Sequence, residues 1–201
     1  MNTQAICNND LRFSHLSCVC PGSVHDSYAI QCTELGKILL DGLRNEYFIA
    51  ADEAYPLSGA LVSRYGGAVE DSFKDSFNYY LSRMRVRIEN AFALLVGKWG
   101  SLWKSLRIPL RRVPIYILAL GRLHNIGIDL DQDSKSQYFD VYEKAGRGRV
   151  VLHRLHVPTP SYLDAIAIST EGKTVARTCR ENMTSFLEER GIVKPLPYNR
   201  D

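Results

Sequence analysis

The longest regular pattern in the chain is a run of apolar residues between Ser72 and Val96 that repeats at steps of three and four. This spacing predicts an α-helix with one apolar face, because a helix completes a turn in about 3.6 residues. Most of the stability of such a helix comes from packing that face against a second layer, so the rest of the chain must supply one. The apolar positions are Leu81, Met84, Ile88, Phe92 and Leu95.

The segments ahead of this helix favour strands. Two β-leaning runs, from Thr3 to Asn8 and from Leu11 to Cys20, flank Asn9-Asp10, which predicts a hairpin turn. The short apolar and aromatic run from Tyr47 to Ala51 predicts a buried strand that stops at Asp52.

Three further helices are expected. One runs from Ser23, as its cap, to about Leu40, one from Pro114 to Ile126, and a polar one from Val175 to Arg190. His124 lies on the second of these, where a single histidine is more often a hydrogen-bonded core residue than a ligand. The order strand, strand, helix, strand, loop, helix, helix belongs to the α/β class.

Composition narrows the class of protein. The 201 residues are 45% hydrophobic and 23% charged, which suits one domain with a sizeable core. The longest apolar runs, such as Ile115 to Leu120, are far shorter than the roughly 20 residues that span a bilayer, so no membrane span is predicted. The N-terminus shows no secretory signal, and an intracellular protein is expected.

The five cysteines, an odd number at irregular positions, fit a reducing compartment better than a disulfide framework. Cys18 and Cys20 lie near His15 and His25, so a metal site is conceivable there. Their spacing matches no zinc pattern, and buried strand thiols are the simpler interpretation.

Positive charge is concentrated between Arg83 and Arg112. This segment has eight basic residues and one acidic residue, a local charge of +7, which leaves −4 for the rest against a total of +3. Together with Trp99 and Trp103 the charges favour phosphate contact and base stacking, although core tryptophans with a solvated rim of charges explain them equally well. The candidate DNA-contacting residues are Arg83, Arg87, Lys98, Lys104, Arg107, Arg111 and Arg112.

Two acids are candidates for catalysis. Asp52 follows a strand, where open α/β sheets build their sites, and Glu89 lies beside the apolar stripe of the long helix. Two carboxylates from different elements are able to hold Mg²⁺ for phosphodiester chemistry. Alternatively, Glu89 pairs with Arg85 on the helix surface and Asp52 caps a turn.

Four sequence blocks in register resemble the DDE superfamily endonuclease domain of PIF/Harbinger transposases. The resemblance covers about Thr3 to Leu130. The blocks are Pro21-Gly22-Ser23-Val24-His25-Asp26-Ser27, Ala51-Asp52-Glu53-Ala54-Tyr55-Pro56-Leu57, Arg83 to Leu95 with Ile88-Glu89-Asn90-Ala91-Phe92 at its centre, and Leu123-His124-Asn125-Ile126.

The resemblance implies an RNase H-like mixed sheet flanked by helices over residues 1–130, with 131–201 as a C-terminal extension of unknown role. It implies metal-dependent cutting of DNA with Mg²⁺ or Mn²⁺ and a location in the nucleus. It also implies a Myb-like DNA-binding protein as a partner.

The resemblance also assigns site residues. Asp52 matches the second catalytic aspartate, with Ala51 in place of the family's glycine, and Glu89 matches the catalytic glutamate, with Asn90 in place of an arginine. Asp26 matches an acid between the first and second members of the triad. Its expected role is to support the site or to cap a helix, in preference to a role as a metal ligand.

The start of the chain departs from the family. The first catalytic aspartate belongs to an Asp-Gly-Thr-like block on a central strand ahead of Thr3, and this chain has no such block. Asp10 is no substitute, because it occupies the hairpin turn. We therefore expect an impaired nuclease. The alternatives are a non-catalytic DNA- or protein-binding module derived from a transposase, and an unrelated α/β interaction domain.

Overall fold

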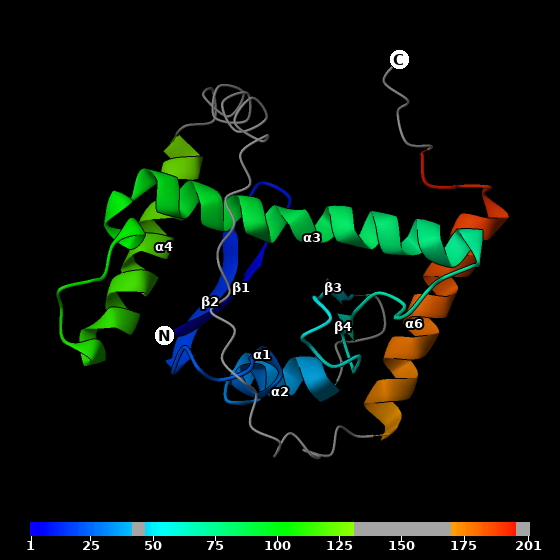
Figure 1. Cartoon of the computed structure of the whole chain (residues 1–201), viewed down its shortest axis with the longest axis horizontal. Coiled ribbons are helices and arrows are strands. Elements are labelled where there is room, and N and C mark those ends of the chain that lie inside the picture. Colours follow the sequence, from blue (N-terminus) through cyan, green and yellow to red (C-terminus); the bar gives the residue numbers. More distant parts are fainter. Residues whose placement is uncertain (42–46, 131–169, 196–201) are drawn as a thin grey trace.

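The computed structural model describes residues 1–41, 47–130 and 170–195. Within these ranges two small sheets lie along one long helix (Figure 1). Strands β1 (Asn2–Cys7) and β2 (Phe13–Cys20) are antiparallel, and β3 (Ile49–Ala50) and β4 (Leu61–Val62) are parallel. Helix α3 (Ser72–Lys98) contacts both β1 and β3. The α/β class predicted from the sequence is confirmed.

The hairpin between β1 and β2 forms at the predicted turn. The side-chain Oδ1 of Asn8 accepts hydrogen bonds from the backbone N–H groups of Asp10 and Arg12, each at 3.0 Å. Leu11 has a φ of 65°, in the left-handed region that side chains other than glycine seldom adopt. Asp10 therefore lies in the turn, as expected.

The single helix predicted from Ser23 to about Leu40 is wrong, because two helices occupy this segment. They are α1 (Asp26–Gln31) and α2 (Glu34–Asp41). Between them the hydroxyl of Thr33 donates to the carbonyl of Ile30 and accepts from the N–H of Gly36, both at 2.8 Å, which ends one helix and caps the next. The cap of α1 is the side chain of His25, not Ser23.

The long helix matches its prediction. Asp71 caps α3 by accepting from the N–H groups of Phe73 and Lys74. Two short 3₁₀ turns, η1 (Gly100–Trp103) and η2 (Leu110–Arg112), lead to α4 (Val113–Leu130), which has Pro114 in its first turn.

Helix α4 is fixed to β2 by two neighbouring side chains. Asn125 accepts from the N–H of Phe13 at 2.8 Å and donates to its carbonyl at 2.9 Å. His124 is buried against the ring of Phe13, and its Nε2 is 2.9 Å from the carbonyl oxygen of Leu11. The core role predicted for His124 is confirmed.

The C-terminal helix α6 (Thr170–Glu189) also agrees with the sequence, and it packs against α3 and β4. Ala176 of this helix is fully buried. The hydroxyl of Tyr65 lies 3.1 Å from that of Thr184, and the N–H of Lys194 donates to the hydroxyl of Ser76 at 2.9 Å. The predicted division at residue 130 stays a prediction.

The core of the described residues is divided into three clusters. One joins β1 and β2 to α4 and the C-terminal half of α3, the second joins α1 and α2 to β3 and β4, and the third joins β4 to the N-terminal half of α3 and to α6. In these segments no helix is both long and apolar enough to cross a membrane.

Candidate active site and basic surface

Asp52 lies at the edge of the sheet where β3 and β4 both end. Ala50 pairs with Val62 in the parallel register, so Asp52 and Arg64 follow their strands by the same two residues. The carboxyl ends of parallel strands are a preferred place for binding sites in α/β proteins. Asp52 also accepts a hydrogen bond from the N–H of Glu53 at 2.8 Å, so the predicted turn contact exists as well.

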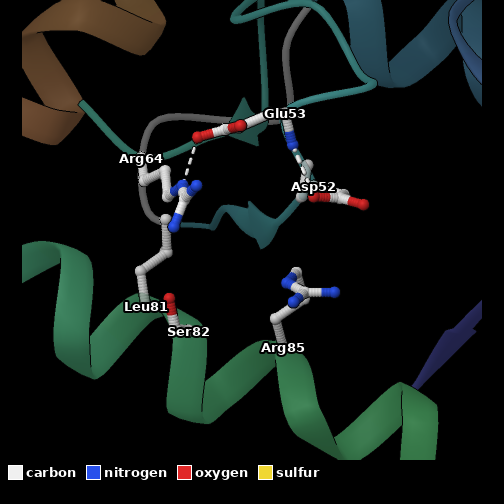
Figure 2. Close-up of a pocket in the computed structure, with 7 residues that line it drawn as sticks. Asp52, Glu53, Arg64, Leu81, Ser82 and Arg85 are labelled. Atoms are coloured by element: carbon white, nitrogen blue, oxygen red, sulfur yellow. Dashed lines mark hydrogen bonds and ion pairs between the residues drawn. The ribbon is translucent and has the colours of Figure 1, made fainter. Parts of the chain in front are cut away.

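A pocket of about 100 Å³ opens beside Asp52. Figure 2 shows Arg64 joined to Glu53 on one side, while Arg85 rises from α3 toward Asp52. The lining contains two carboxylates and two guanidinium groups, so it carries no net charge. The residues that line the pocket are Ala51, Asp52, Glu53, Arg64, Leu81, Ser82 and Arg85.

Glu89 lies one helical turn beyond Arg85 and does not line this pocket. The Nη1 atom of Arg85 donates to Oε1 of Glu89 at 2.6 Å, and the Glu89 side chain is 55% exposed. The surface pairing considered from the sequence is thus present, and such a pair contributes only about 0.3–0.5 kcal/mol. Arg85 is the residue shared by the pocket of Asp52 and the carboxylate of Glu89.

Asp26 lies elsewhere. It is the first residue of α1, and its Oδ1 accepts from the side-chain amide of Asn2 at 2.7 Å. An acid in the first turn suits the positive end of the helix dipole. The supporting role expected for Asp26 fits this contact, and its tentative role as a ligand stays a prediction.

The carboxylates of this site suit only a metal ion that takes some of its ligands from the protein and the others from water or substrate. The described residues contain no group of three or more His, Cys, Asp and Glu side chains placed to hold a metal, the conceivable site around Cys18 and Cys20 included. Mg²⁺ is commonly held by one or two carboxylates together with water and substrate phosphates. Glu89 is paired with Arg85 and lies outside the pocket that Asp52 lines, so the role of these two carboxylates as metal ligands stays a prediction.

Two charged residues of the pocket, Glu53 and Arg64, are not among the site residues that the sequence predicts. The segment after Asp52 is a loop in the prediction, whereas the structure has β4 there. The available signal was the short apolar run Ala60-Leu61-Val62 ending before a charged residue, which repeats the pattern of β3 and Asp52.

The predicted DNA-contacting residues fall into two groups. Arg83 and Arg87 lie in the middle of α3, and the guanidinium of Arg83 rests over the ring of Tyr79. Lys98 ends α3, and its Nζ lies against Gly127 of α4. The other four, in the connection between α3 and α4, are exposed and form no salt bridge in the described part of the chain; they are Lys104, Arg107, Arg111 and Arg112.

The two tryptophans differ. Trp99 packs against the first core cluster, while the side chain of Trp103 is 60% exposed beside Lys104. Trp99 is thus a core residue, whereas Trp103 is exposed, and contact of this basic segment with phosphates and bases stays a prediction.

A family model described as DDE superfamily endonuclease matches residues 1–125, and this range includes all of the candidate site residues. The chain is 27% identical over 152 residues to a protein of Arabidopsis thaliana described as "Protein ALP1-like". That match covers 67% of this chain and 36% of the relative, so the chain spans about a third of the length of this relative. No solved structure matches the chain.

Proposed function

Because the chain belongs to the DDE superfamily endonuclease family, we propose that it is a metal-dependent, transposase-derived nuclease domain that acts on DNA. Asp52 and Glu89 are its proposed metal ligands, with Mg²⁺ or Mn²⁺ as the ion. The observation that carries the proposal is the position of Asp52 at the carboxyl end of a parallel strand pair, above a helix whose Arg85 also holds Glu89.

A bound divalent ion would polarise a phosphodiester and activate water for its attack. The residues of the chain would do the positioning. Asp52 is already oriented by the N–H of Glu53, and Arg85 and Arg64 place two positive charges beside it, which suits a phosphate group. Glu89 would become available once a phosphate takes its place on Arg85.

An RNase H-like arrangement is part of the same proposal. It is supported by an antiparallel hairpin, a parallel strand pair that follows it in the chain, and a long helix that contacts both. Action in the nucleus and cooperation with a Myb-like protein also remain proposals, which rest on the family resemblance.

The proposal is tested by measuring Mn²⁺ binding to the whole chain by calorimetry. The parent is compared with the variants Asp52→Asn and Glu89→Gln, and Asp10→Asn is the control. Asp10 is an exposed acid in the hairpin turn, away from the pocket. We expect the parent and the Asp10 variant to bind, and the other two to lose binding. A folded parent that takes up no Mn²⁺, or one that binds equally well with Asp52→Asn, would refute the proposal.

The variant Arg85→Gln makes the same experiment more specific, because we expect it to gain Mn²⁺ affinity. Removing this guanidinium frees Glu89 and takes a positive charge from the pocket, so Mn²⁺ affinity should rise while stability falls by only about 0.3–0.5 kcal/mol. Weaker Mn²⁺ binding by this variant would argue against Glu89 as a ligand.

A second candidate function, a non-catalytic DNA-binding module, is favoured by the exposed basic connection and Trp103. The measurement is fluorescence anisotropy with a labelled duplex over a range of salt. For the double variant Arg111→Gln/Arg112→Gln the salt slope should fall by about two, because each lost phosphate contact lowers it by roughly 0.9. The control is Lys173→Gln/Arg177→Gln on α6, and equal slopes for both double variants would exclude this surface.

A further inference from the structure

Helix α4 carries apolar side chains on two faces. One face packs inside the molecule, where Gly121 lies directly against the side chain of Leu16 in β2. The other face stays uncovered by the described residues, with exposed fractions of 45% for Leu123, 51% for Ile126 and 83% for Leu130. In Figure 1, α4 lies at the edge of the molecule, at the end opposite α6. A helix with apolar residues around most of its surface is normally buried on more than one side, so this face suits a contact with another molecule.

The exposed face of α4 is centred on Ile126. Leu123 comes three residues before Ile126 and Leu130 four residues after it, so the three side chains share one face of the helix. The flank beside them is charged, because Arg122 comes four residues before Ile126 and Asp129 three residues after it. One turn to either side of Ile126 therefore presents one leucine and one charged residue, and the two charges are opposite.

This arrangement is complementary to itself when a second copy of α4 runs in the opposite direction. A two-fold axis at Ile126 reverses the order of residues along the helix, so each residue one turn before it meets a residue one turn after it in the second copy. Arg122 then lies opposite Asp129 of the second copy, and Leu123 lies opposite Leu130, and both contacts occur twice. In a parallel pair each charged residue would meet its own equivalent, which like-charge repulsion disfavours.

Both charged side chains are accessible for this contact. Arg122 is exposed and forms no salt bridge with any described residue. Asp129 is paired with Arg12, yet its side chain is still 52% exposed, and an ionised carboxylate accepts several hydrogen bonds at once. The contact therefore pairs charges at its rim while it covers three apolar side chains on each copy.

We propose that this face of α4 is a self-association surface, on which a second copy of the chain packs its own α4 in the antiparallel direction around Ile126. The contact spans about two and a half turns of the 18-residue helix. Its total buried area should therefore not exceed the lower limit of specific interfaces, about 1,200 Å². A reversible dimer whose population depends on concentration is expected. The inference goes beyond the proposed metal chemistry and does not depend on it.

Sedimentation velocity on the whole chain, from about 1 μM to about 300 μM, tests the proposal. We expect the parent to shift from monomer to dimer over this range. Ile126→Asp places two carboxylates at the two-fold axis and should weaken the dimer at least ~30-fold. Ile115→Asp is the matched control, because Ile115 is 69% exposed on the same helix but lies outside the contact, so this variant should dimerise like the parent.

Charge reversal tests the orientation of the two helices. Arg122→Asp leaves only acids at the rim and Asp129→Arg leaves only bases, so each variant alone should dimerise at least ~10-fold more weakly than the parent. An equimolar mixture of the two variants should dimerise like the parent, because opposite charges then meet at both ends of the contact. Circular dichroism of each variant verifies that it is folded.

Three outcomes would overturn the inference. A parent that stays monomeric over the whole range would show that no second copy covers this face. A dimer that Ile115→Asp weakens as much as Ile126→Asp would place the contact elsewhere on the helix. A mixture of the two charge variants that dimerises no better than each alone would exclude the antiparallel arrangement.

Discussion

At the scale of single residues, Arg85 connects the two halves of the candidate site. It lines the pocket of Asp52 and donates to Glu89, so one guanidinium is in contact with the surroundings of both proposed metal ligands. A phosphate group that binds Arg85 would compete with Glu89 for the same N–H donors. Under the proposed function, substrate binding and release of this acid would therefore be linked.

His124 gives a residue-scale prediction of pH dependence. Burial lowers its pKa below the ordinary 6.5, with the nearby charge of Lys98 acting in the same direction, although the contact with Leu11 opposes both. The unfolded chain therefore binds more protons, and stability should fall as pH drops through about 6.5.

Urea unfolding at about pH 7.5 and about pH 5.5 checks this expectation. His124→Gln should be less stable than the parent at the higher pH but should lose less stability between the two. Burial also lowers the pKa of His15, so part of the slope should remain. A variant with the parent's full slope would contradict the assignment to His124.

At the scale of elements, asparagine side chains join helices to neighbouring backbone in two places. Asn125 of α4 bonds both backbone groups of Phe13, and Asn78 of α3 bonds both backbone groups of Tyr65. An amide is suited to this because it offers an acceptor and a donor side by side. The helices are thus fixed in position by directional bonds as well as by apolar packing.

Asn125→Ala tests this type of contact. It leaves the N–H and carbonyl of Phe13 without partners in a half-buried position, so the free energy of unfolding should drop by about 1–3 kcal/mol. Urea denaturation measures the change, with Asn9→Ala in the exposed hairpin turn as the control. Equal midpoints for the two variants would show that the paired bonds contribute nothing.

At the scale of the whole molecule, α6 belongs to the packed structure despite its distance in sequence. Helix α6 packs against α3 and β4, its Ala176 is fully buried, and the guanidinium of Arg180 lies 4.1 Å from the ring centroid of Tyr65. The third core cluster depends on α6, because Cys179, Met183 and Leu187 complete it.

Ala176→Asp should therefore detach α6 and lower stability by at least about 2 kcal/mol, since it places a carboxylate in an apolar contact. The neighbouring Val175→Asp, at a position 37% exposed, should have a much smaller effect. Urea denaturation measures the loss of stability, and the rate of tryptic cleavage after Arg177 measures the detachment of α6. Similar cleavage rates in both variants would show that α6 does not depend on this contact.

The sequence by itself determined the elements whose signals are local. The apolar stripe of α3, the turn at Asp10 and Pro114 at the start of α4 each depend on residues within a few positions, and these elements formed where predicted. The family was also evident from sequence blocks, because those blocks keep their order and spacing along the chain.

Only the tertiary structure decided how these elements meet. Thr33 divided a predicted helix through bonds to Ile30 and Gly36. Arg64 lines the pocket of Asp52 because two short strands end in register. A cleft of about 1190 Å³ lined by β1, β3 and α3 has no local sequence signature either. Pockets, core boundaries and open strand edges depend on contacts between distant segments, which residue spacing along a single sequence does not encode.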